Sequence, residues 1–214
     1  MFRRKIYGKL KQWKTESDGR TALLIEGARR VGKSTIVEEF AKREYESYIM
    51  IDFAAASQLV KDLFRDLSDL NYIFLQLQLQ YKVDLKERKS LIIFDEVQLC
   101  PLARQAIKTL VKDKRYDYIE TGSLISIKQN VKDILIPSEE RKINMYPMDY
   151  EEFLWALGDE TTMPLLQKVF ESLKPVGEQL NRKLMRDFRL YMLVGELKKE
   201  SDIICLPVYL ASFM

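Results

Sequence analysis

Residues 27–34 of the chain match the pattern G-x-x-x-x-G-K-[ST] at every defined position. The apolar segment Thr21–Ile25 precedes the motif and predicts a buried strand, and Thr35–Ala41 follows it with the spacing of a helix. In this order of strand, glycine-rich loop and helix, backbone N–H groups surround the phosphates of a nucleoside triphosphate. The motif therefore predicts an α/β fold built around a phosphate-binding loop.

Each part of this motif has its own expected role. The two glycines allow the backbone to wrap closely around an anion. The Lys33 ammonium group is expected to reach the β- and γ-phosphates, and the Ser34 hydroxyl group is expected to ligate Mg²⁺. The residues predicted to surround the nucleotide are Gly27, Ala28, Arg29, Arg30, Val31, Gly32, Lys33, Ser34 and Thr35.

The rest of the chain predicts strands that alternate with helices. The further strands are expected at Ser47–Phe53, Leu91–Phe94, Asp117–Thr121 and Arg141–Tyr146. The helices between them are expected at Leu59–Leu67, Leu70–Tyr81 and Pro101–Val111. This alternation is typical of a three-layer α/β sandwich with a mainly parallel, five-stranded central sheet. The segment Leu75–Gln80 also alternates like a strand, but a helix is favoured because the crossover connection needs one.

Four segments follow from these patterns. They are an amphipathic N-terminal helix at residues 1–18, a phosphate-loop core at 19–158, a helical extension at 159–195 and an atypical tail at 196–214. The apolar face of the first helix is predicted from the helical spacing of Phe2, Ile6, Leu10 and Trp13. The chain is therefore expected to fold as one α/β domain with helices appended to it.

Composition excludes several kinds of site. The 214 residues include no histidine, which removes Ser-His and Cys-His nucleophilic schemes and most zinc sites. Cys100 and Cys205 lack metal-ligand spacing. No signal peptide is visible, and no apolar stretch reaches the ~20 residues that span a bilayer, so a cytoplasmic location without membrane association is expected. The net charge is +3, but residues 1–35 carry an excess of lysine and arginine that is either solvated or attracts nucleotide or nucleic acid.

An acidic pair follows the predicted strand Leu91–Phe94. Asp95 and Glu96 end this apolar run, and the carboxyl ends of parallel strands meet at the edge where ligands bind. Asp95 is expected to hold the magnesium shell, and Glu96 is expected to orient and polarise the attacking water. The alternative is an acidic strand end that only contacts solvent.

Two further positions complete the predicted hydrolytic site. The segment Thr121–Ser123 ends the next strand, where the hydroxyl group of Thr121 or Ser123 is expected to hydrogen-bond the water or the γ-phosphate. Arg141 is expected to offset charge that develops on the γ-phosphoryl group, a role worth ~10³–10⁵ in rate where an arginine fills it. A polar turn and a surface arginine are the respective alternatives.

Together these motifs resemble those of prokaryotic ATP-binding proteins of the AAA superfamily, whose ATPase core precedes a C-terminal domain of uncharacterised function. The similarity rests on Gly27–Thr35, Asp95–Gln98, Thr121–Ser123, Arg141 and Tyr146–Phe153. It implies an ATP–Mg²⁺ site with Lys33, Ser34, Asp95 and Glu96 in the roles given above. It also implies a sensor at Thr121 or Ser123 and an arginine finger at Arg141.

The chain departs from that family's pattern at two places. The arginine finger usually follows a glycine, whereas Glu140 precedes Arg141 here. The family continues from Tyr191–Gly195 into a second glycine and a proline, whereas Glu196–Glu200 follows here. Residues 196–214 are therefore expected to reflect a truncation, a shifted reading frame or a natural short variant.

Two functional hypotheses follow from the sequence. The first is a Mg²⁺-dependent ATPase that hydrolyses ATP to ADP and phosphate and uses the energy to change shape. The second is a nucleotide-gated module for binding DNA or protein, with negligible turnover. An inert remnant of a longer gene is a third alternative. The expected partners are ATP, a second copy of the chain in a homo-oligomer, and a nucleic-acid or protein client.

Overall fold

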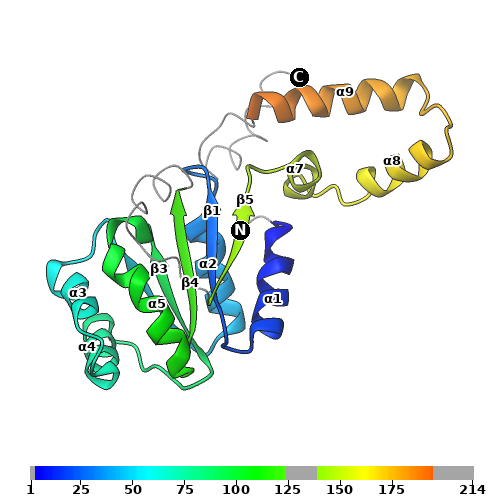
Figure 1. Cartoon of the computed structure of the whole chain (residues 1–214). Helices are drawn as coiled ribbons and strands as arrows, with labels where there is room; N and C mark the ends of the chain where they lie inside the picture. The colour runs from blue at the N-terminus through cyan, green and yellow to red at the C-terminus, as the bar shows by residue number, and fades with distance from the viewer. Residues whose placement is uncertain (1–2, 124–138, 195–214) are drawn as a thin grey trace. The chain divides into compact units, whose positions relative to one another are not determined.

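The computed structural model describes residues 3–123 and 139–194. Two compact units divide the chain, one formed by Ile6–Met145 and the other by Met1–Lys5 together with Tyr146–Met214. The first unit contains the sheet, and the second is helical (Figure 1).

A five-stranded parallel sheet forms the centre of the first unit. Its strands are β1 (Ala22–Gly27), β2 (Ser47–Asp52), β3 (Ser90–Asp95), β4 (Asp117–Ser123) and β5 (Glu140–Met145). They lie in the order β2-β3-β4-β1-β5, and every neighbouring pair is parallel. β4 is therefore inserted between β1 and β3, which places its last residues between the ends of those two strands.

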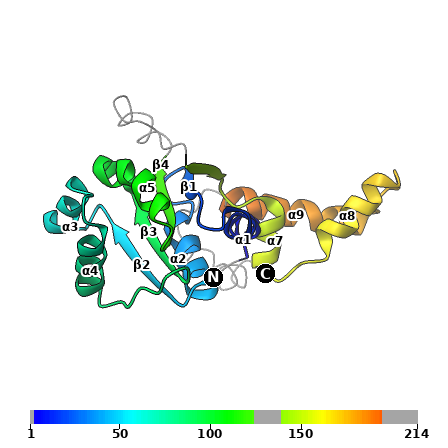
Figure 2. The ribbon, with the colours of Figure 1, turned by 60° about the horizontal axis from the view of Figure 1, so that its bottom comes forward.

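Helices cover both faces of this sheet. They are α1 (Ile6–Ser17), α2 (Lys33–Glu44), α3 (Gln58–Asp62), α4 (Leu70–Tyr81) and α5 (Pro101–Asp113), with the short 3₁₀ helices η1 (Leu63–Arg65) and η2 (Val97–Leu99). Residues of α3, α4 and α5 form one apolar core with the sheet, and residues of α1 and α2 form the other. Figure 2 shows these two groups on opposite sides of the strands. The predicted three-layer α/β architecture is confirmed.

Burial on both faces explains the continuous apolar runs of the strands. In β1, Leu24 contributes to the core under α3–α5, whereas Leu23 and Ile25 contribute to the core under α1 and α2. A parallel sheet covered by crossover helices requires apolar side chains in both directions. The sequence of β3 follows the same rule, since all of its residues are buried.

The ambiguous segment Leu75–Gln80 lies within the helix α4 (Leu70–Tyr81), as favoured from the sequence. The Asp69 side chain caps it by accepting a hydrogen bond from the Tyr72 backbone N–H, and Ile73 and Leu77 are buried one turn apart. The helix expected over Leu59–Leu67 is divided into α3 and η1.

The helix α1 (Ile6–Ser17) lies within the segment 1–18 where the sequence predicts an amphipathic helix. Ile6, Leu10 and Trp13 lie at intervals of three and four residues and are buried in the core shared with α2. Phe2, the fourth predicted apolar residue, lies outside the described residues.

The second unit consists of helices and a short N-terminal segment. Its helices are α7 (Tyr150–Ala156), α8 (Thr162–Glu171) and α9 (Glu178–Val194). Asp149 and Glu152 form a capping box at the start of α7. Glu152 also accepts hydrogen bonds from Arg4 Nε at 3.1 Å and from the Lys5 backbone N–H at 2.6 Å. The expected helical C-terminal part is present, and the domain boundary expected at residue 158 stays a prediction. The tail of residues 196–214 lies outside the described residues.

Gly27, the last residue of β1, lies where two backbones approach closely. A Cβ atom added there would be 2.3 Å from the Met145 carbonyl oxygen. Gly27 and Met145 are paired between β1 and β5, so this oxygen cannot move away without disturbing the sheet. We expect Gly27→Ala to lower the free energy of unfolding by ~1–3 kcal/mol, as measured by urea denaturation.

Gly8→Ala provides the matched control for that substitution. Gly8 lies inside α1, and a Cβ atom added there meets no heavy atom within 4 Å. An alanine in an exposed helix interior should raise stability by ~0.5–1 kcal/mol. If Gly27→Ala were as harmless as Gly8→Ala, the close approach of β1 and β5 would be disproved.

Candidate nucleotide-binding site

The loop between β1 and α2 lies at the carboxyl edge of the sheet. Its backbone is left-handed at Arg30 and at Gly32, with φ values of 64° and 88°. Gly32 is the N-cap of α2 and supplies no side-chain oxygen to the first turn of that helix. Because the first backbone N–H groups of a helix have no partner within it, they are available to bind an anion.

The Lys33 ammonium group lies inside this loop. Nζ donates hydrogen bonds to the carbonyl oxygens of Gly27 at 3.2 Å and Ala28 at 2.7 Å. Burial lowers the pKa of Lys33 from its ordinary value, and the nearby carboxylates of Glu96 and Asp95 act in the opposite direction. In the part of the chain that the structure describes, this ammonium group forms no ion pair, so its positive charge suits a phosphate.

Ser34, Asp95 and Thr121 meet across three elements of the fold. Ser34 Oγ, in the first turn of α2, donates to Asp95 Oδ1 at 2.7 Å. The Thr121 hydroxyl group donates to the same oxygen. The strand order explains this contact, because β4 lies between β1 and β3 and brings Thr121 to Asp95.

The oxygen atoms of Ser34 and Asp95 fit a magnesium ion. Mg²⁺ prefers oxygen ligands, and beside a nucleotide it typically uses one or two protein groups, substrate phosphates and water. The described residues contain no cluster of three or more acidic, cysteine or histidine side chains that could hold a metal alone. The donor set therefore suits a metal that arrives with a triphosphate better than a permanently bound metal.

Glu96 follows β3 with an unusual backbone conformation. Its φ and ψ angles are 51° and 46°, in the left-handed region that residues other than glycine rarely occupy. Its backbone N–H donates to Thr121 Oγ1 at 3.3 Å, and its carboxylate accepts a hydrogen bond from the Gln98 side-chain amide. The sequence motifs assign no role to Gln98, although it belongs to the segment Asp95–Gln98 that carries the family resemblance. Its spacing of two residues from Glu96 is the signal that points to it.

The other loop and strand-end residues differ in their surroundings. Ser123 is buried at the end of β4 and is paired with Gly27, which places it beside the start of the loop. Arg29 and Arg30 are exposed. Ala28 and Thr35 are exposed as well, and Val31 is half-buried. The structure thus brings Ser123 to the start of the loop that surrounds Lys33.

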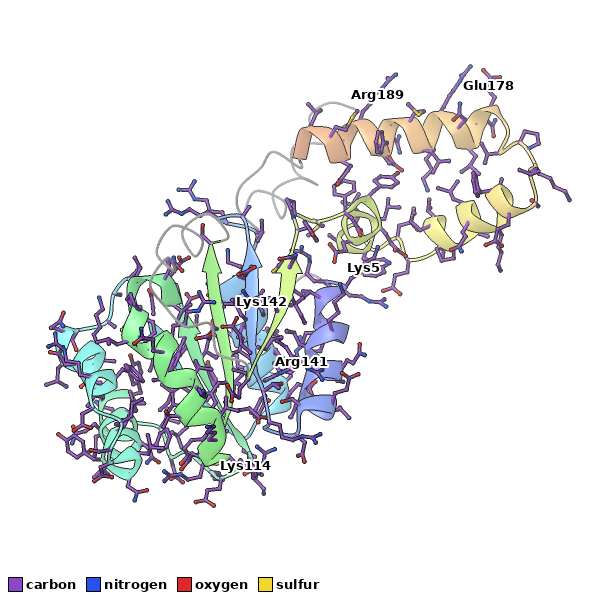
Figure 3. All side chains as sticks on the ribbon, in the orientation of Figure 1. Lys5, Lys114, Arg141, Lys142, Glu178 and Arg189 are labelled. Carbon is purple, nitrogen blue, oxygen red and sulfur yellow. The ribbon has the colours of Figure 1, made fainter. Side chains whose placement is uncertain are left out.

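The structure does not bring Arg141 to this edge. Arg141 is the second residue of β5 and is paired with Leu23, whereas Met145, four residues later, is paired with Gly27. Four residues of extended chain span ~13 Å. The Arg141 guanidinium group instead forms an ion pair with Glu16 at 2.7 Å, near the amino ends of the strands (Figure 3). In this structure Arg141 therefore does not lie at the loop of its own chain, and its role as an arginine finger stays a prediction.

Glu140, which departs from the family pattern, has a structural role. Its side chain is fully buried and lies 3.3 Å from Arg104 Nη2, which is also buried. Glu120 lies beside this pair, and burial, followed by the charge of Glu140, raises its pKa well above the usual range. Glu140 therefore belongs to a buried charged cluster under α5.

Comparison with known proteins identifies the family. The model of the AAA domain matches residues 19–154, which is more than half of the chain. The chain belongs to the AAA domain family.

An uncharacterised protein of Haemophilus influenzae is 24% identical over 163 residues, covering 72% of this chain and 38% of that protein. A Walker-type ATPase of Pyrococcus abyssi is 19% identical with a TM-score of 0.46, over 84% of this chain and 61% of that one. This AAA-family chain thus spans less than two thirds of either relative.

Membership in the AAA domain family confirms the resemblance and supports an ATP-binding function of the ATPase type. Nucleotide binding in the family is usually accompanied by Mg²⁺, which agrees with the oxygen ligands described above. No helix within residues 3–123 and 139–194 combines the length and the apolar character needed to cross a membrane.

Proposed function

We propose that this AAA-family protein hydrolyses ATP to ADP and phosphate and uses the free energy for a change in shape. The observation that carries the proposal is the direct contact of Ser34 with Asp95 beside the buried ammonium group of Lys33. Lys33 supplies positive charge for the triphosphate, and Ser34 and Asp95 supply oxygen ligands for its Mg²⁺ ion.

Binding is assigned to the loop and the start of α2. The backbone N–H groups of the loop and Lys33 would hold the β- and γ-phosphates, and Ser34 and Asp95 would hold Mg²⁺. Bound Mg²⁺ would neutralise charge on the two phosphates during transfer. The exposed Arg29 and Arg30 have no assigned role in this scheme.

Hydrolysis is assigned to Glu96. Its carboxylate would accept a proton from the attacking water as a general base. Thr121 supports this assignment because its hydroxyl group contacts both Asp95 and the backbone of Glu96, and so links the metal ligand to the base. Loss of the γ-phosphate from the site would alter the surroundings of Asp95. The Thr121 hydroxyl group would transmit this change to the backbone of Glu96, as expected of a sensor.

Removal of Mg²⁺ tests the proposal. We expect the protein to release phosphate from ATP in the presence of Mg²⁺, and we expect an excess of EDTA to reduce the rate at least ~100-fold. Excess Mg²⁺ should restore the rate, and a preparation denatured by heat serves as the control. Release that is insensitive to EDTA would contradict the proposed chemistry.

ATP binding is measured separately by thermal unfolding. At a hundredfold excess over the dissociation constant, ATP–Mg²⁺ should stabilise the protein by ~2.7 kcal/mol. A gain in melting temperature without phosphate release would favour the nucleotide-gated binding module. Absence of both would reject ATP as the ligand.

The nucleic-acid version of that module has less support. Several basic residues of the N-terminal segment are engaged in ion pairs, including Lys5 with Asp149 at 2.6 Å and Lys11 with Glu44 at 3.4 Å. Cations paired in this way are less available to phosphate groups of DNA.

A further inference from the structure

The turn after β3 brings the side chain of Gln98 onto Glu96. Because Glu96 is left-handed and η2 follows it at once, Gln98 folds back and its side-chain amide Nε2 donates to Glu96 Oε2. Gln98 is buried, whereas Glu96 is half-buried. The carboxylate is therefore held from its buried side, and within the described residues its other oxygen, Oε1, accepts no hydrogen bond.

The backbone of the turn does not depend on this side chain. The Leu99 N–H donates to the Glu96 carbonyl oxygen at 2.9 Å, and the Cys100 N–H donates to the Val97 carbonyl oxygen at 3.0 Å. These two bonds are those of a 3₁₀ turn and close it without any side chain. The hydrogen bond from the Gln98 amide to the carboxylate is therefore not needed to close the turn.

The chemistry of an amide suits a group that orients a base. A general base is most effective when a third group fixes its direction, as in a nucleophile, base and orienting-residue arrangement. An amide N–H can fix the direction of the carboxylate without adding a positive charge. A positive charge beside Glu96 would reduce its ability to accept a proton. A lysine at this position would stabilise the ionised carboxylate and make Glu96 a weaker base, whereas a neutral amide adds no charge.

We propose that Gln98 is a positioning residue for hydrolysis, which fixes Glu96 so that Oε1 faces the attacking water. This inference rests on the proposed ATPase function. Thr121 holds the backbone of Glu96 and Gln98 holds its carboxylate, so that the base is fixed at both ends.

The test replaces the amide and separates turnover from binding. Gln98→Met keeps an unbranched side chain of similar length but removes the donor, and we expect kcat for ATP hydrolysis to fall ~10–100-fold, the range of supporting residues around reactive groups. KM and the ATP-induced gain in melting temperature should stay within about twofold of the parent values. Gln98→Glu, which cannot donate when ionised and repels Glu96, should lower kcat further. Leu99→Met is the matched control in the same turn, because Leu99 is exposed, and should leave kcat unchanged.

A double-mutant cycle distinguishes positioning from a structural role. In a Glu96→Gln background, Gln98→Met should cause no further loss in single-turnover rate, because the carboxylate on which it acts is absent. An independent loss in that background, or an unchanged kcat in Gln98→Met, would overturn the proposal. If Gln98→Met does not fold stably, the single-turnover rates of Gln98→Glu in the parent and Glu96→Gln backgrounds provide the same comparison. Parent turnover that depends on Glu96 but not on Gln98 rejects this inference alone, whereas absent parent turnover rejects the proposed function itself.

Discussion

Lys33→Ala is expected to remove most of the gain in melting temperature that ATP–Mg²⁺ gives the parent protein. The Lys33 ammonium group is buried among the carbonyl oxygens of the loop, and in the described structure it has no carboxylate partner at ion-pair distance. A phosphate would therefore gain an interaction with a desolvated positive charge. Loss of one partner from a buried, hydrogen-bonded charge pair costs ~2–5 kcal/mol, so affinity should fall at least ~30-fold.

Thermal unfolding and calorimetric titration with ATP–Mg²⁺ measure this effect. Lys42→Ala is the matched control, because Lys42 lies on the same helix, α2, but is exposed and pairs with Glu38 at 2.7 Å. The control should keep the full gain in melting temperature. Equal ATP affinity in Lys33→Ala and the parent would remove Lys33 from the binding site and would place the ligand elsewhere.

The loop and the acidic strand end could be predicted because each is local in the sequence. Gly27–Ser34 needs only its own flanks, and Asp95 follows directly from the apolar run of β3. The contact between Asp95 and Thr121 is different, because it requires β4 to lie between β1 and β3. Strand order depends on how the crossover helices pack, and short motifs do not encode it.

Arg141 and Gln98 show two further limits of local patterns. The pattern placed Arg141 at the start of the fifth strand, and in a parallel sheet the start of a strand lies at the edge opposite to the ligand. The position of Arg141 beside Leu23 follows from that rule. Gln98 reaches Glu96 only because Glu96 adopts a left-handed backbone. The residue at this position is neither glycine nor asparagine, so the sequence does not predict that conformation.

Glu96→Gln is expected to retain ATP binding and to lose turnover at least ~100-fold. Glutamine has nearly the shape of glutamate but cannot accept the water proton, and general-base catalysis contributes ~10²–10⁴-fold. The hydrogen bond from the Glu96 backbone N–H to Thr121 does not involve the changed group, so the loop and Asp95 should keep their geometry. ATP bound to this variant should therefore persist through gel filtration, whereas the parent should release ADP.

Single-turnover measurement with labelled ATP separates this outcome from a binding defect. Glu38→Gln is the matched control on α2 and should turn over ATP at the parent rate. Glu38 is half-buried and its carboxylate contacts Lys42 and Tyr48, and ion pairs of this partly exposed kind contribute little. A Glu96→Gln rate within about threefold of the parent rate would mean that another group activates the water. Since Lys33→Ala weakens binding and Glu96→Gln removes only the chemical step, the two variants together separate a nucleotide-holding protein from one that hydrolyses its ligand.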